Sequence, residues 1–168
     1  MRKRCLFALL LFFSFHALGD DYSELPVDVQ APLLAKVLDF STSMNAEVSV
    51  YVLDSDEFAA SIKKAVGKPV GEKKIVSVVA GKDLPTSKPD VLYVGNSKRL
   101  DEAVRYAKEN HILTATGIPR LVKKGISLGF GLSREEKKPK ILLNRNASKQ
   151  GSVSWNAAIF KIAVIQEE

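Results

Sequence analysis

Small polar residues follow three of the strands that the sequence predicts, and together they could bind a small anion. Ligands of open α/β sheets usually bind at the carboxyl ends of parallel strands, where helix N-termini offer free backbone N–H groups. The residues at such ends, with one nearby cation, are Asp54, Ser55, Gly95, Asn96, Ser97, Thr114, Thr116, Gly117 and Arg120. The alternative is that Ser, Thr, Asn and Asp only cap helices here. A meeting of all three loops in space would favour a binding site for a carboxylate or another small anion.

The sequence contains no recognisable catalytic constellation and no thiol after the first nineteen residues. Cys5 is the only cysteine, and His111 is the only histidine beyond residue 19. Thiolate zinc sites, Fe–S clusters and thiol switches are therefore excluded for the remaining chain, and general-base arrangements are scarce. Gly125, Gly129 and Gly131 do not form a phosphate loop, because they alternate within an expected strand. We expect a protein without enzymatic activity, metal or cofactor.

The first nineteen residues resemble a cleaved secretory signal peptide. Arg2, Lys3 and Arg4 precede a short apolar run from Leu6 to Phe15, and small residues lead to a cleavage site near Gly19. The apolar run is about half of the roughly 20 residues that span a bilayer. We expect a periplasmic protein with a signal peptide over 1–19, a flexible lead-in over 20–27 and one domain over 28–168.

The charge of the chain gives little support for nucleic-acid binding. The whole sequence has 25 basic and 19 acidic residues, and three of the basic ones lie in the expected signal peptide. The remaining excess of positive charge is mild, and export removes the usual nucleic-acid partners. We therefore expect no nucleic-acid partner.

Strand and helix patterns alternate along the chain, which predicts an α/β fold. We expect a single three-layer domain with a mostly parallel sheet, an antiparallel strand pair near the C-terminus and helices on both faces. Strands are predicted over 47–53, 74–80, 90–95, 112–116, 126–133 and 141–144. Helices are predicted over 29–40, 57–66, 97–110, 118–124, 144–150 and 153–165.

Two features of the last third indicate contacts with another element or another chain. Large and bare positions alternate from Ile126 to Ser133, so a helix or a second chain is expected to pack on the bare face. The expected terminal helix is apolar nearly all round, so it is either central in the core or meets another subunit. If it forms an interface, its residues are Trp155, Ile159 and Ile162.

The order of these segments resembles the YfiR-like (YfiR/HmsC-like) family of exported bacterial proteins. The resembling segments are 29–40, 90–94, 112–119, 125–130 and 140–144, with Ala147 and the apolar C-terminal segment. The resemblance implies a small periplasmic α/β domain, often dimeric and without catalytic activity. Better-understood relatives repress an inner-membrane diguanylate cyclase by contacting its periplasmic region. They contain cysteines, so this chain departs from them in lacking thiols after residue 19.

Two functions follow from these observations. The first is a periplasmic regulator that docks on an inner-membrane signalling protein, such as a diguanylate cyclase or a sensor kinase, with a homodimer as one expected form. The second is a binding module for a small anionic solute, similar to one lobe of a periplasmic binding protein. The second depends on whether the loops at 54–55, 95–97 and 114–117 meet.

Overall fold

The computed structural model describes residues 21–166, so the expected signal peptide lies outside the described residues. Within them the chain forms one mixed sheet of nine strands. Their bounds are β1 Tyr22–Ser23, β2 Glu47–Leu53, β3 Pro69–Val70, β4 Lys73–Gly81, β5 Val91–Val94, β6 Leu113–Thr116, β7 Leu128–Ser133, β8 Pro139–Asn144 and β9 Ala163–Gln166. This confirms the predicted single α/β domain.

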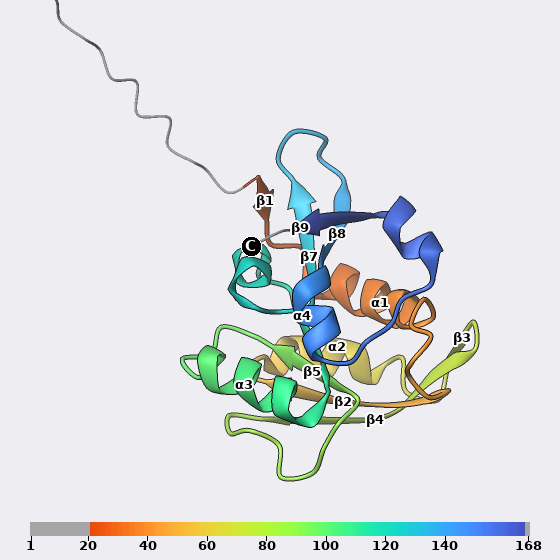
Figure 1. Cartoon of the computed structure of the whole chain (residues 1–168), viewed down its shortest axis with the longest axis vertical. Coiled ribbons are helices and arrows are strands. Elements are labelled where there is room, and N and C mark those ends of the chain that lie inside the picture. The colour runs from red at the N-terminus through yellow and green to blue at the C-terminus, as the bar shows by residue number, and fades with distance from the viewer. Residues whose placement is uncertain (1–20, 167–168) are drawn as a thin grey trace, which may run out of the picture.

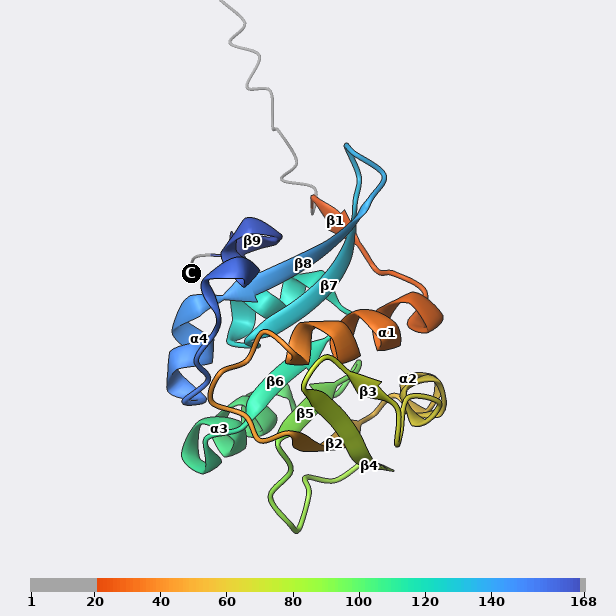
Figure 2. The same ribbon diagram turned by 90° about the vertical axis from the view of Figure 1, so that its right-hand side faces the viewer.

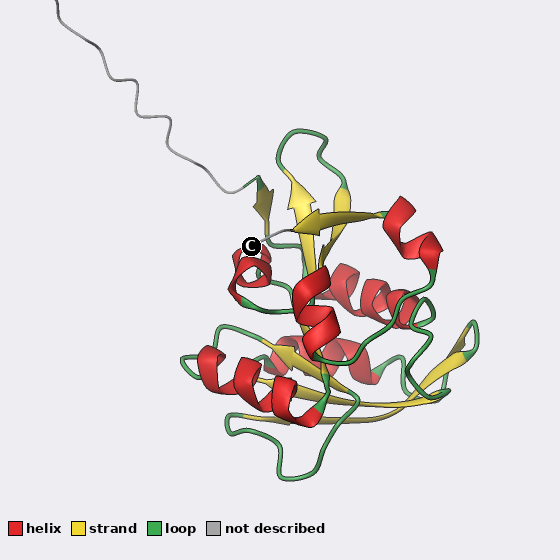
Figure 3. Ribbon diagram, viewed as in Figure 1, coloured by secondary structure: helices red, strands yellow, loops and turns green. Residues whose placement is uncertain are grey.

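Helices cover both faces of this sheet (Figures 1 and 3). The α-helices are α1 Val27–Leu38, α2 Asp56–Lys63, α3 Leu100–Asn110 and α4 Arg145–Gln150. Two 3-10 helices, η1 Pro119–Lys124 and η2 Ala157–Lys161, complete the described elements. One apolar core lies under α1 and α2 and includes Leu34 and Phe58. A second core lies under α3 and η1 and includes Ala103 and Leu121, so the sheet is the middle layer of three.

The strand order places the first long strand inside the sheet. The order is β3-β4-β2-β5-β6-β7-β8-β9, with β1 beside β7. Strands β4, β2, β5, β6 and β7 are mutually parallel, whereas β7 and β8 are antiparallel. Successive connections run in opposite directions from β2, towards β4 and then towards β5. The topological switch point, where such sheets usually bind ligands, therefore lies between β2 and β5.

The bare face of β7 is covered from within the chain. A Cβ atom on Gly129 would collide with the Val122 side chain of η1. A Cβ atom on Gly131 would lie 2.9 Å from both Pro119 Cγ and Tyr22 Cβ. The glycines allow η1 and β1 to lie directly on the strand, as the alternating pattern predicted for a helix on that face.

The predicted helix over 153–165 is wrong. Asn156 instead caps the short η2 helix, and Ala163–Gln166 form β9, which pairs in parallel with β8. Val164 and Ile165 suit a strand because branched side chains favour extended backbone. Ile162, which ends η2, lies three residues before Ile165, a spacing that also fits a helical stripe, and only the open edge of β8 decides between the two.

The described residues of the expected flexible lead-in pair with the sheet and pack on the core. Tyr22 and Ser23 pair with Ser133 and Leu132 of β7, and Leu25 is buried. Helix α1 then begins at Val27 after Pro26, so Asp28 lies in the first turn and does not cap the helix. Asp28 still suits this position, because a carboxylate is favourable near the positive end of the helix dipole.

Candidate functional site

The loops that follow β2 and β5 meet at the switch point, as the sequence suggested, but they leave no space between them. A Cβ atom on Gly95 would collide with the carbonyl oxygen of Asp54 and lie 2.9 Å from Ser55 Cβ. The backbone of Asp54 is left-handed, with φ 54°, and its N–H donates to the Gly81 carbonyl at 3.0 Å. The Gly95 N–H donates to the Leu53 carbonyl at 2.8 Å. The N–H groups of Asp54 and Gly95 are therefore already used within the protein.

Gln30 of α1 fills the space at the carboxyl ends of β5 and β6, beside the switch point. Its side chain is 3% exposed, and its Nε2 donates to the Leu25 carbonyl at 2.5 Å. The Tyr93 hydroxyl of β5 donates to Gln30 Oε1 at 2.6 Å. Gly117, after β6, packs directly on this amide, because a Cβ atom there would collide with it. A side chain of the protein thus occupies the place where a ligand's polar group would bind.

Tyr93 is held in an apolar setting around this contact. Its ring stacks on Phe58 of α2 with centroids 3.5 Å apart and planes 5° apart. Burial raises the pKa of the Tyr93 hydroxyl well above its ordinary value, since the phenolate would lose its hydration. The Gly117 backbone acts in the opposite direction but more weakly, and Glu24 adds to the increase. Tyr93 is therefore a neutral hydrogen-bond donor at any physiological pH.

Sequence reasoning missed Gln30 and Tyr93, although one signal pointed to Gln30. It lies four residues before Leu34, on the apolar stripe of α1. A polar residue on a buried face requires a partner, because an unpaired buried amide is costly. That requirement could have marked Gln30 before the fold was known, whereas nothing in the sequence identifies Tyr93 as its partner.

The two candidate threonines, Thr114 and Thr116, form hydrogen bonds in different parts of the fold. Thr116 donates to the Val94 carbonyl at 2.7 Å and accepts from the Ile118 N–H at 3.1 Å, which braces the loops after β5 and β6. Thr114 lies away from them, where its hydroxyl donates to Ser127 Oγ at 3.1 Å and accepts from the Ser127 N–H at 2.8 Å. Thr114 therefore does not belong with the switch-point loops.

The other candidates at this edge have local roles or face solvent. Ser97 Oγ accepts from the Arg99 N–H at 3.1 Å at the start of α3, and Asn96 is exposed. Arg120 is about half exposed and lies 3.8 Å from a carboxylate oxygen of Glu24. It borders a hollow of about 60 Å³ that Tyr22 and Lys123 also line. Among the candidates, Arg120 is the one that borders this hollow.

A larger hollow lies at the opposite end of the sheet, beside the amino ends of β5 and β6. This cleft has a volume of about 200 Å³ and is lined by Ser43, Met44, Asn45, Lys88, Asp90, His111, Leu113, Gly151, Ser152 and Val153. His111 and Ser152 are both left-handed, with φ 54° and 55°, and Ser152 Oγ lies 3.0 Å from His111 Nδ1. The larger of these two hollows therefore lies away from the loops at which the sequence predicts the ligand site.

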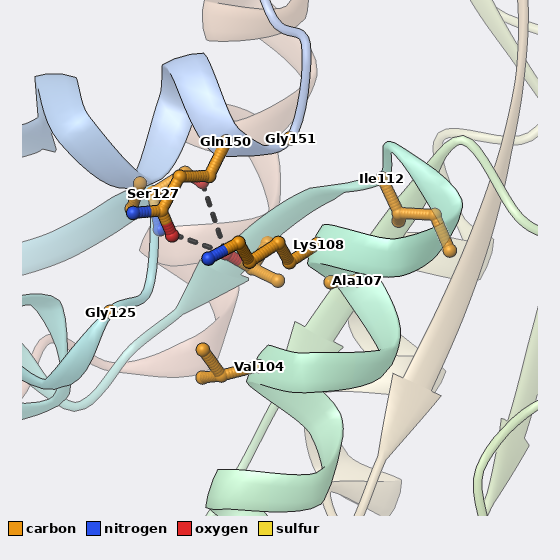
Figure 4. Close-up of a pocket in the computed structure, with 10 residues that line it drawn as sticks. Val104, Ala107, Lys108, Ile112, Gly125, Ser127, Gln150 and Gly151 are labelled. Carbon is orange, nitrogen blue, oxygen red and sulfur yellow. Dashed lines mark hydrogen bonds between the residues drawn. The ribbon is translucent and has the colours of Figure 1, made fainter.

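A third hollow, between α3 and α4, is too small for a solute. Figure 4 shows Val104, Ala107 and Lys108 of α3 facing Ser127 and the end of α4. The volume of about 10 Å³ accommodates about one water molecule. The Thr114–Ser127 pair lines this hollow and supplies polar groups for such a water.

The three residues predicted for an interface occupy different environments. Ile159 is fully buried and belongs to the core, so it is not available to another chain. Ile162 is 49% exposed, close to Phe160, whose ring lies 5.3 Å from the Arg145 guanidinium carbon. Trp155 is partly exposed, but its indole nitrogen is buried without a hydrogen-bond partner. Other large apolar side chains at the surface are Val66, Val76 and Val79.

Across 21–166, no group of three or more His, Cys, Asp or Glu residues could hold a metal ion. Over the same range, none of the helices has the length and apolar character required to cross a membrane.

The fold and the closed switch point define a doubly wound α/β domain whose usual ligand crevice is filled by its own side chains. Comparison with protein-family models identifies its family, because the YfiR/HmsC-like model matches residues 29–164. The chain belongs to the YfiR/HmsC-like family. This family is known in cyclic-di-GMP regulation and is generally regulatory rather than catalytic.

A solved structure supports the fold independently. The crystal structure of a conserved domain protein from Vibrio cholerae matches with a TM-score of 0.55 at 16% sequence identity. The match covers 86% of this chain and 62% of that chain, so this protein spans less than two thirds of the solved one. No curated protein matches the chain. At this identity the similarity concerns the fold alone.

Proposed function

We propose that the protein is a non-enzymatic regulator in the periplasm that acts by docking on an inner-membrane signalling protein. The observation that carries the proposal is membership of the YfiR/HmsC-like family, whose known role is in cyclic-di-GMP regulation. The partner is the periplasmic region of a diguanylate cyclase or of a sensor kinase. The secretory pattern of residues 1–19 supports the compartment, because a basic start, an apolar run and small residues follow one another.

The closed switch point supports docking in preference to solute binding. The alternative of an anion-binding module relied on open loops at the carboxyl ends of β2, β5 and β6. Asp54 contacts Gly95 there, and Gln30 fills the space beside Gly117. A solute would have to displace a buried amide that satisfies two partners, which costs about 1–3 kcal/mol for each group left unpaired. We therefore do not favour the solute-binding alternative.

Deletion of the gene, followed by complementation, tests the proposed function. Relatives repress a cyclase, so deletion should raise cellular cyclic-di-GMP and matrix production, and the full chain should restore both. A variant lacking residues 2–19 is the matched control, because it contains the whole folded domain but none of the export pattern. It should fail to restore either readout.

A direct test of docking uses a photo-reactive amino acid at exposed positions spread over the surface, in cells that express the full chain. Cross-linking to an inner-membrane signalling protein from one surface, and not from the others, is the expected result. Unchanged cyclic-di-GMP after deletion, together with no membrane protein cross-linked from any surface, would contradict the proposal.

A further inference from the structure

Strand β4 leaves most of one backbone edge free. Its inner edge pairs with β2 along the whole strand, from Lys74 to Gly81. Its outer edge pairs with β3 only at Lys73 and Lys74, and the Ile75 carbonyl accepts from the Gly67 N–H at 2.9 Å. Beyond Ile75, no strand of the described chain pairs with that edge. Figure 2 shows β4 at the margin of the sheet.

The direction of the free backbone groups follows from the bonds on the inner edge. The N–H and C=O of one strand residue point to the same side, and successive residues alternate. The Gly81 carbonyl accepts from the Asp54 N–H on the β2 side, so Val79 and Ser77 also face β2. Val78 and Ala80 therefore present their N–H and C=O groups outward. Val48 pairs with Ile75 and Ser49 pairs with Ser77, so Val76 is an extra residue, or bulge, in β4. The bulge reverses the alternation, and the carbonyl of Ile75 therefore also points outward.

The composition of this segment is unusual for an open edge. Residues 75–81 contain no charge and no proline, and five of them are Ile, Val or Ala. Val76 is 38% exposed and Val79 is 56% exposed. Proteins usually protect open edges with charges, prolines or very short strands, because an apolar edge pairs with other chains. The bulge at Val76 and the lysines at the two ends are the only such devices in this strand.

We propose that the outer edge of β4 binds an extended segment of a partner protein, with an acidic residue at one end, by adding it as a further strand. Backbone bonds to Val78 and Ala80 give affinity in this mode of recognition, and side-chain pockets give specificity. Lys82 follows the uncharged stretch and favours a carboxylate at that end of the added segment. At the other end, Lys74 already pairs with Glu47 at 3.1 Å, and β3 covers the edge. This segment belongs to the membrane protein of the proposed function, so the inference rests on that function.

A second copy of this chain fits the edge less well. An antiparallel pair of two β4 strands with its two-fold axis at Val78 would place Lys82 of one copy opposite Lys74 of the other. Strand β3 already pairs with Lys74 on that edge, so the continuing chain of a second copy would meet β3. A short segment of another protein can end before β3 and still bond to Val78 and Ala80.

Binding is tested with two synthetic peptides and the protein purified after expression of the full chain. Both peptides contain the same alternating Thr-Val core; one has aspartate and glutamate at its ends and the other has lysine. Fluorescence anisotropy at low salt should show the acidic peptide binding at least about tenfold more tightly. This preference should decrease in high salt, because exposed charges are screened. Equal binding of the two peptides, or binding of neither, overturns the proposal.

Two variants locate the peptide on β4. Ala80→Pro removes an outward N–H and leaves the bonds to β2 intact, so the affinity for the acidic peptide should decrease about tenfold. Ala80→Ser keeps the N–H and should bind as the wild type does. Lys82→Glu leaves the backbone unchanged and should weaken the acidic peptide relative to the lysine peptide. The matched control, Lys149→Glu on α4, should not. Unchanged binding in both Ala80→Pro and Lys82→Glu overturns the proposal.

Two further readouts separate this inference from its competitors. If light scattering shows a dimer that Ala80→Pro converts to a monomer, a second copy occupies the edge and the proposal fails. If a photo-reactive group at position 80 cross-links no membrane protein while one at another surface does, the edge assignment fails and the proposed function stands. If the peptides bind β4 as expected but deletion leaves cyclic-di-GMP unchanged, the proposed function fails and the edge remains a strand acceptor.

Discussion

Replacing Gly117 by alanine is expected to destabilise the protein by expelling Gln30 from the switch point. Gly117 does not have a left-handed backbone, so alanine fits its conformation, and the collision of the new methyl group with the Gln30 amide dominates the cost. Once displaced, the amide no longer donates to the Leu25 carbonyl or accepts from Tyr93. Both residues are buried, and a buried polar group without a partner costs about 1–3 kcal/mol. Loss of both bonds amounts to about 2–6 kcal/mol.

A double-mutant cycle measured by urea denaturation tests this reasoning. Gln30→Ala alone should lower the free energy of unfolding by a similar amount, because it removes the same two bonds. The double variant should be no less stable than Gln30→Ala, so the coupling energy should equal the cost of Gly117→Ala alone, about 2–6 kcal/mol. Gly67→Ala is the control for additivity: alanine is strained by the left-handed backbone there (φ 79°), but no atom lies within 4 Å of the added Cβ, so its effect should add to that of Gln30→Ala. If Gly117→Ala and Gln30→Ala are additive within about 0.5 kcal/mol, Gln30 does not fill the switch point as described.

Two other substitutions have expected effects. Because burial raises the pKa of Tyr93 above its ordinary value of 10.0, its neutral form stabilises the fold below about pH 10, and that stability is lost as pH rises further. The free energy of unfolding above pH 10 should therefore decrease less steeply in Tyr93→Phe than in the wild type, by up to about 1.4 kcal/mol per pH unit, and equal slopes would refute the assignment. Gly129→Ala should lower the melting temperature by about 2–10 °C, because overpacking against Val122 costs about 1–3 kcal/mol. An unchanged melting temperature would show that η1 does not press on β7.

Local patterns were sufficient to predict most of the fold. The strand over 47–53 was predicted with the bounds that the structure has, because branched and aromatic residues alternate there without a competing helical stripe. The continuous apolar run at 91–94 forms a strand buried on both faces, as parallel strands usually are. The prediction failed at 153–165, where the three-residue spacing of Ile162 and Ile165 fits a helix while Val164 and Ile165 also favour a strand. Pairing with β8 decided the outcome, and such pairing depends on segments far apart in the sequence.

The position of the candidate site could be predicted from the sequence, but whether its loops leave an open space could not. The parallel order brings the loops after β2 and β5 together, and the sequence named Asp54 and Gly95 for that reason. Whether the loops leave a space depends on Gln30, whose helix approaches the switch point from another part of the chain. The open edge of β4 could not be predicted from the sequence either, because 74–80 has the same pattern whether the strand lies inside a sheet or at its margin. Only the strand order makes it an edge.

The strand order also has a consequence for where a partner can approach the sheet. After β2, the strands β5, β6, β7, β8 and β9 follow in the order of the sequence, each beside the one before it. The margin formed by β4 lies at the opposite side of the sheet from β9. A partner bound there is therefore separated from the C-terminal strand by the whole width of the sheet.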